Sequence, residues 1–183
     1  RPIDYKDSER LQRSIERLEG DGPHPLVLHT LGGLWGASMQ IAQAIRRKGG
    51  IVALVPHWAQ SGGTLIALAC DSIVMPPFAT LGPVDPQIGG YASRALRDLV
   101  STKPVAEIDD HTWLMAHQAE QALAIAKAYV EGIAPKAVER LVGGGIPHST
   151  PISREEAISI GLPIVPIDSL NALQAFTHKL TAS

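Results

Sequence analysis

The first half of the chain alternates between short apolar runs and stretches in which apolar residues recur with helical spacing. The apolar runs cover 26–29, 51–55 and 72–75, and the helical stretches cover 7–19, 37–47 and 62–70. Runs of this length without polar alternation are typical of strands that are buried on both faces, as in parallel sheets. Strands that alternate with helices in this way predict an α/β fold in which helices cover a parallel sheet.

The second half contains a turn-rich segment, further helical stretches and a final strand. The expected elements are an ordered loop at 79–90, helices at 112–131 and 135–142, and a strand at 162–167. Ser153 followed by Glu156 has the spacing of a capping box and predicts one more helix. Neither an internal repeat nor a low-complexity tract interrupts the pattern, so we expect a single domain over residues 1–183.

The composition is that of an ordinary globular protein. Hydrophobic residues make up 45% of the 183 residues, charged residues 19% and aromatic residues only 4%, so the core must be largely aliphatic. The net charge of −2 gives no reason to expect a nucleic-acid partner. The single cysteine, Cys70, follows an apolar run and is expected to be a buried structural thiol.

The sequence does not predict a membrane span. The longest apolar stretch, 64–77, is interrupted by Asp71 and is too short to cross a bilayer. The chain begins with Arg1 rather than Met, which leaves open an upstream leader or membrane anchor. We therefore expect a cytoplasmic protein, or one that associates with a membrane through a segment outside this sequence.

Ser61 is the strongest candidate for chemistry, because it separates an apolar strand from an apolar helix. At the N-terminus of the helix 62–70, free N–H groups and the helix dipole favour the negative charge of an oxyanion. Gly32 and Gly33 follow the preceding strand in the same way. Because successive parallel strands present their carboxyl ends at one edge of a sheet, these residues together predict an acyl-transfer site. Each feature alone also fits a structural role, as a helix cap or a tight turn.

Four blocks of the sequence carry a family resemblance. They are His29-Thr-Leu-Gly-Gly33, Ser61-Gly-Gly-Thr-Leu-Ile-Ala-Leu68, Leu81-Gly-Pro-Val-Asp-Pro-Gln-Ile-Gly-Gly90 and Glu107-Ile-Asp-Asp110. Together they resemble the serine dehydrogenase proteinase family, which belongs with the Clp-class serine proteases. The resemblance implies a Clp/crotonase-like spiral of ββα units, hydrolysis of a peptide or protein substrate, and a homo-oligomer.

The same resemblance assigns roles to individual residues. It implies that Ser61 is the nucleophile and that the backbone N–H groups of Gly62 and of Gly32 or Gly33 bind the oxyanion. A side chain on either loop would occupy the space of the scissile carbonyl. We expect an extended peptide substrate to pair with the sheet edge near Gly32 and Gly33.

The general base is harder to assign. A Clp-type Ser-His-Asp triad would place a histidine on the turn after the serine, but Asp85 stands in that neighbourhood. The segment that resembles the place of the Clp acid is Pro147-His-Ser-Thr-Pro-Ile152, with Ser149 where the aspartate would be. A Clp triad is therefore not expected.

A dyad of Ser61 and Lys103, of the signal peptide peptidase type, fits the spacing better. Lys103 would have to be neutral near pH 7, which requires desolvation against apolar neighbours such as Pro104, Val105 and Trp113. An ordinary exposed lysine is the competing interpretation. The alternative bases, in declining order, are His117, His57 and Lys127.

No metal or cofactor is expected, because the seven histidines show no ligand-pair spacing. Two other functions stay open. An α/β-hydrolase esterase would use Ala59-Gln-Ser-Gly-Gly63, which differs by one residue from the nucleophile-elbow pattern of that class. Asp168 and His178 would then be the acid and the base, since they follow Ser61 in the chain order of that class. A crotonase-like acyl-thioester enzyme, or a catalytically inactive scaffolding relative, would use the same oxyanion loops without a covalent bond to Ser61.

Overall fold

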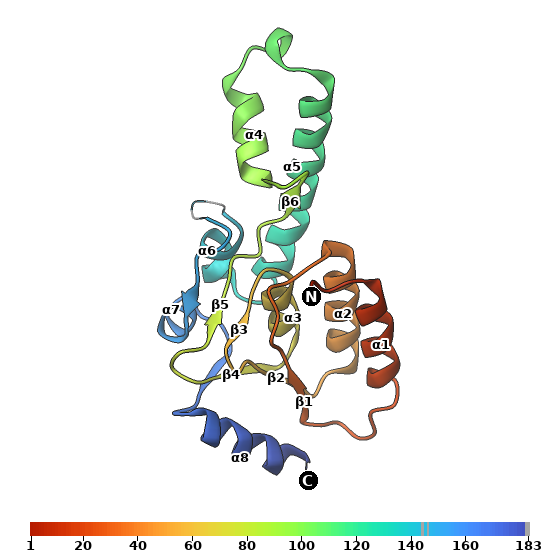
Figure 1. Ribbon diagram of the computed structural model, residues 1–183, viewed down its shortest axis with the longest axis vertical. Coiled ribbons are helices and arrows are strands. Elements are labelled where there is room, and N and C mark those ends of the chain that lie inside the picture. The colour runs from red at the N-terminus through yellow and green to blue at the C-terminus, as the bar shows by residue number, and fades with distance from the viewer. Residues whose placement is uncertain (144, 146, 182–183) are drawn as a thin grey trace. The chain divides into compact units, whose positions relative to one another are not determined.

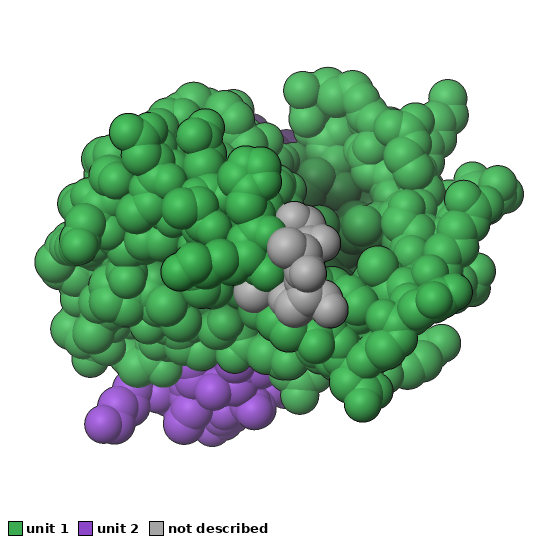
Figure 2. Space-filling view, turned by 90° about the horizontal axis from the view of Figure 1, so that it is seen from below, with its two compact units in different colours: residues 1–82, 151–183 green, residues 83–150 purple. Residues whose placement is uncertain are grey.

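The computed structural model describes residues 1–143, 145 and 147–181, and its packing divides the chain into two compact units. Unit 1 comprises residues 1–82 and 151–183, and unit 2 comprises residues 83–150 (Figures 1 and 2). The single domain over residues 1–183 stays a prediction.

Unit 1 is built around a four-stranded parallel sheet with the strand order β1-β2-β4-β9. Its strands are β1 (His24–Val27), β2 (Ile51–Leu54), β4 (Ser72–Met75) and β9 (Ile164–Pro166). Ala53 of β2 lies opposite Leu26 on one side and Ile73 on the other. The central strands β2 and β4 are almost wholly buried, as their uninterrupted apolar runs predict. β1 includes Pro25, which a strand at the edge of a sheet tolerates.

Helices pack against this sheet, so the predicted α/β architecture is confirmed. The helices of unit 1 are α1 (Tyr5–Ile15), α2 (Trp35–Lys48), α3 (Gly62–Ala69), α7 (Arg154–Ser159) and α8 (Leu170–Thr181). α2 packs against both α1 and α3 (Figure 1). α8 was not predicted. Its Leu173 packs against Val52, Leu54 and Val74 of the sheet, and this apolar contact stabilises the helix.

A second, three-stranded sheet lies where the chain enters α3. Its strands are β3 (Trp58–Ala59), β5 (Thr80–Leu81) and β8 (Ile152–Ser153). The central strand β5 is parallel to β3 and antiparallel to β8. Strands of two residues are too short to leave a readable alternation in the sequence, so the pattern did not predict them. β3 leads directly into Gln60 and Ser61, the candidate nucleophile.

Unit 2 is mainly helical. It contains the hairpin strands β6 (Gln87–Ile88) and β7 (Tyr91–Ala92), the helices α4 (Ser93–Thr102), α5 (Asp110–Glu131) and α6 (Val138–Val142), and the 3-10 helices η1 (Val105–Glu107) and η2 (Pro135–Ala137). α4 and α5 pack through Leu96, Ala116 and Ala119. α5 begins two residues before its predicted start, and α4 was not predicted because it follows a segment dominated by turn formers.

Thr64 connects three parts of unit 1 through hydrogen bonds of its side chain. Its side chain is fully buried in the first turn of α3. The Thr64 hydroxyl donates to the carbonyl of Ala59 at 2.7 Å and accepts from the backbone N–H of Gly82 at 3.0 Å. The helix that carries Ser61 at its N-terminus is therefore fastened to the strand before it and to the end of β5.

We expect Thr64→Val to lower the free energy of unfolding by about 2–4 kcal/mol, because it leaves a buried carbonyl and a buried N–H without a partner. Urea denaturation measures this loss. Thr64→Ser keeps the hydroxyl and serves as the control, with a smaller loss. Equal stability of the two variants would show that these bonds contribute little.

Candidate active site

Ser61 has an unusual backbone conformation for a residue with a side chain. Its φ of 51° and ψ of −118° make it the one non-glycine residue with positive φ in the described part of the chain. It occupies the N-cap position of α3, yet its side chain makes no capping hydrogen bond. A cap residue normally lies in the β region and uses its side chain. The structure therefore disfavours a plain capping role and resembles the strained turn that exposes a nucleophile.

Gly32 lies directly against this turn. Its φ is +97°, and an added Cβ would lie 2.8 Å from both the Gln60 carbonyl oxygen and Ser61 Cβ, and 2.9 Å from Gly62 N. A side chain at this position would press on the nucleophile. The two loops that the sequence predicted to meet therefore do meet within unit 1.

Gly33 faces a different neighbour. An added Cβ would lie 2.2 Å from the carbonyl oxygen of Ile3, which pairs with Gly33 in a parallel β-bridge. Ile3 N donates to Gly32 O, and Leu34 N donates to Ile3 O, each at 2.9 Å. A side chain on Gly33 would thus disturb packing rather than fill the space beside Ser61. The edge on which we expected the substrate is partly occupied by the chain itself.

The backbone N–H groups near Ser61 differ in their availability. Gly62 N and Gly33 N have no hydrogen-bond acceptor among the described residues. Gly32 N donates to Thr30 Oγ1 at 3.1 Å. A Cβ added to Gly62 would lie 3.5 Å from Gly33 N and 2.3 Å from Ser38 Oγ. The Gly62 and Gly33 amides are therefore close together, and the buried Ser38 explains why residue 62 lacks a side chain.

Unit 2 holds a histidine–aspartate pair. His148 Nδ1 lies 2.5 Å from Asp85 Oδ1. The Asp85 side chain is 2% exposed, whereas the His148 side chain is 35% exposed and therefore accessible to a reactant. The hydrogen bond to Asp85 raises the pKa of His148, against the opposing effect of partial burial. An imidazole held at Nδ1 by a buried carboxylate is the arrangement of a general base with its orienting acid.

The pattern of the sequence does not predict this pair, although both residues lie in segments that resemble the Clp family. Asp85 stands in the neighbourhood where a Clp histidine is expected, and His148 lies next to Ser149, where the Clp aspartate is expected. The two residue types are exchanged between the two positions. A histidine and an aspartate at exchanged positions can still pair, and this exchange is the sequence signal for the Asp85–His148 pair.

Lys103 lies at the C-terminal end of α4, where its side chain is exposed. The apolar neighbours that were expected to desolvate it are themselves exposed: Val105 is 77% exposed and Trp113 is 50% exposed. The described structure therefore supplies little desolvation around the Lys103 ammonium group.

The alternative histidine bases lie in other surroundings. His117 is exposed on α5, where it stacks on Trp113 with the ring centroids 5.9 Å apart. His57 is half-buried among aromatic rings of unit 1, with centroid distances of 5.3 Å to His29 and 5.9 Å to Phe78. Neither has a carboxylate bound to its ring among the residues described.

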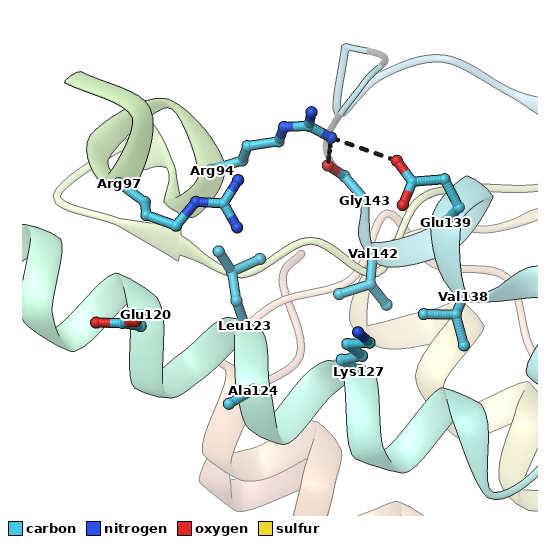
Figure 3. Close-up of a pocket in the computed structure, with 10 residues that line it drawn as sticks. All are labelled: Arg94, Arg97, Glu120, Leu123, Ala124, Lys127, Val138, Glu139, Val142 and Gly143. Carbon is cyan, nitrogen blue, oxygen red and sulfur yellow. Dashed lines mark hydrogen bonds and ion pairs between the residues drawn. The ribbon is translucent and has the colours of Figure 1, made fainter. Parts of the chain in front are cut away.

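Lys127 lines a cleft of about 400 Å³ in unit 2, formed by α4, α5, α6 and Gly143 (Figure 3). Figure 3 shows Arg94 bonded both to the carbonyl of Gly143 and to Glu139, which fastens the end of α6 to α4. Cations and carboxylates are mixed in this cleft, because Arg97 and Glu120 also line it. The cleft contains neither the Ser61 turn nor the Asp85–His148 pair.

Other candidate chemistry finds little support. Cys70 is buried, as predicted, and burial raises the pKa of its thiol to about 12. Within the described residues, three or more potential metal ligands do not gather at any point. None of the described helices has the length and apolarity needed to cross a membrane.

Comparison with known proteins identifies a family. The family model of ClpP-like SDH-type serine proteinases matches residues 1–173. Two curated proteins of Methanocaldococcus jannaschii are similar to this chain. Uncharacterized protein MJ0137 is 38% identical over 172 residues, covering 88% of this chain and 60% of that protein. Uncharacterized protein MJ1495 is 33% identical over 193 residues, covering 98% and 66%. The chain thus spans about two thirds or less of the length of these relatives.

Solved structures show the fold. ClpP1 from Listeria monocytogenes has a TM-score of 0.68 and 16% identity, with 94% of this chain and 90% of that chain covered. A mutant of the 1510-N membrane-bound stomatin-specific protease has a TM-score of 0.64 and 22% identity, covering 95% and 79%. Another mutant of that protease, in complex with a substrate peptide, has a TM-score of 0.62 and 22% identity, covering 95% and 74%. The Clp-type fold expected from the sequence is confirmed.

The Asp85–His148 pair generates a titration prediction. We expect His148 to titrate above its ordinary pKa of about 6.5, because Asp85 stabilises the imidazolium. Asp85→Asn removes that charge while partial burial remains, so the pKa of His148 should fall. Ring-proton NMR measures both titrations. Asp98→Asn, an exposed carboxylate of the same unit, is the matched control, and an unaltered His148 titration in Asp85→Asn would contradict the pairing.

Proposed function

Because the chain belongs to the family of ClpP-like SDH-type serine proteinases, we propose that it hydrolyses peptide bonds with Ser61 as the nucleophile. The observation that carries this proposal is the backbone of Ser61, which combines a positive φ with a side chain free of capping bonds. Holding a serine in that conformation costs on the order of 1–3 kcal/mol. A residue needed only as a helix cap would not require it.

The backbone amides of Gly62 and Gly33 are the proposed oxyanion hole. Attack of Ser61 Oγ on the scissile carbonyl converts its oxygen to an oxyanion, which needs N–H donors already in place. Support comes from the closeness of these two amides and from the absence of a bound acceptor at either, among the described residues. Gly32 serves the site differently, by leaving room for Ser61.

His148 is the proposed base, with Asp85 as its orienting acid. An imidazole in this role accepts the proton of the attacking hydroxyl and later gives it to the leaving amine. Binding of Nδ1 to Asp85 supports this role, because it directs the lone pair to Nε2. The Ser61–Lys103 dyad remains the rival assignment, and the exposure of Lys103 argues against it.

The substrate and the assembly are further parts of the proposal. We expect a peptide or protein substrate, a homo-oligomer, and either a cytoplasmic location or a membrane association through another segment of the protein. A fold shared with ClpP1 and with a protease named as membrane-bound is compatible with both locations.

Ser61→Ala should lower peptidase activity by about four to six orders of magnitude, because the attack step is lost. It should also abolish labelling by a fluorophosphonate probe. Ser159→Ala, an exposed serine of α7 in the same unit, is the control that keeps both properties. A parent chain that resists the probe would instead favour the crotonase-like or inactive alternative.

His148→Gln should lower kcat/KM by at least about a thousandfold, whereas Lys103→Arg should be nearly silent. In the parent, kcat/KM should rise with pH through the raised pKa of His148, because the base acts in its neutral form. The opposite result, an inactive Lys103→Arg beside an active His148→Gln, would assign the base to Lys103, since a guanidinium cannot lose its proton at accessible pH.

A further inference from the structure

Both oxygens of the buried Asp85 carboxylate have hydrogen-bond donors. Oδ1 binds His148 Nδ1 at 2.5 Å, and Oδ2 accepts from the side-chain amide of Gln87 at 2.8 Å. The Asp85 side chain is 2% exposed, so water does not replace these donors readily. A buried carboxylate that lost one of them would be left partly unsatisfied.

The positions of the nitrogens determine which atoms carry hydrogen. Gln87 Nε2 lies 3.4 Å from His148 Nδ1, and both face the same carboxylate. A carboxylate oxygen only accepts hydrogen bonds, so His148 Nδ1, which lies 2.5 Å from Asp85 Oδ1, must carry the hydrogen. In the neutral imidazole, the hydrogen then lies on Nδ1 and the lone pair lies on Nε2.

We propose that Gln87 is a positioning residue: its amide holds the Asp85 carboxylate in the orientation that binds His148 Nδ1, and so keeps Nε2 free to accept a proton. The catalytic consequence rests on the proposed function, because it assumes that His148 is the base. The structural consequence, which concerns the tautomer of His148, does not depend on that assumption.

The backbone around Gln87 is arranged to hold its side chain in place. Gln87 pairs with Ala92 across the β6–β7 hairpin, and the connecting turn contains Gly89 and Gly90, both with positive φ. Ser93 N also donates to Pro86 O at 3.0 Å. The residue therefore projects from a closed hairpin rather than from an open loop, which limits the conformational entropy lost when its amide binds Asp85.

The first test measures the tautomer by long-range ¹H–¹⁵N NMR of the histidine rings, in protein that also carries Ser61→Ala. With Gln87 present, neutral His148 should be mainly the Nδ1–H form. Gln87→Met has nearly the same shape but no donor, so the carboxylate can rotate and the Nε2–H form should become substantially populated. Gln118→Met, an exposed glutamine of α5, is the matched control and should leave His148 unchanged.

If Gln87→Met does not fold, Gln87→Glu is a second variant that can contradict the proposal. Gln87→Glu replaces the donor by a second carboxylate near Asp85 and His148, so the imidazolium should be stabilised and the His148 titration should move to higher pH. Circular dichroism and urea denaturation report whether each variant is folded.

Steady-state kinetics measure whether Gln87 affects catalysis. In protein with an intact Ser61, Gln87→Met should lower kcat by roughly tenfold to hundredfold, the range typical of the loss of a hydrogen-bond partner that orients a metal-binding histidine. KM should change little, because the proposed role of the Gln87 amide is to hold Asp85. Folded Gln87 variants with an unchanged tautomer and titration of His148 would overturn the proposal. An active Ser61→Ala protein would overturn the proposed function instead, and the NMR result would still decide the role of Gln87.

Discussion

The backbone conformation of Ser61 is the constraint on which the candidate site depends. A residue with a side chain at φ 51° stays there only if its surroundings hold it. α3 is buried at every position, and Leu65, Ile66 and Leu68 are each no more than 2% exposed. Burial of one such side chain contributes about 1.5–3 kcal/mol. Three of them outweigh a strain on the order of 1–3 kcal/mol, and Thr64 fastens the same turn to β3.

The glycines around this turn follow from the same constraint. Gly32, Gly62 and Gly63 each lie where an added Cβ would come within 3 Å of another atom. Gly32 makes room for Ser61, Gly62 for the buried Ser38, and Gly63 for the methyl group of Thr30. The loops can approach closely enough for two backbone amides to converge because these side chains are missing. The absence of side chains thus serves the packing of these loops and leaves the two amides of the proposed oxyanion hole close together.

The sequence predicted those parts of the protein that depend on local pattern. Buried strands such as 51–55 and 72–75 leave uninterrupted apolar runs, and the turn at Ser61 stands between two of the predicted elements. The pairing of Asp85 with His148 could not be obtained in this way, because 63 residues separate the partners and only the packing of unit 2 brings them together. The different surroundings of Gly32 and Gly33 were equally hidden, since they depend on where Ile3 pairs.

The protonation of His148 connects stability with the proposed chemistry, and the two have opposite pH dependence. Because Asp85 raises the pKa of His148 in the folded state, the pair adds stability at pH values below the ordinary histidine pKa. That contribution is lost as the pH rises through the raised value. A base must act above that value, where the imidazole is neutral. The attraction between opposite charges is then absent, and only hydrogen bonds hold the ring. The orientation of the Asp85 carboxylate therefore matters most in the state that would react, which is why its second partner, Gln87, has a role that the ion pair alone would not require.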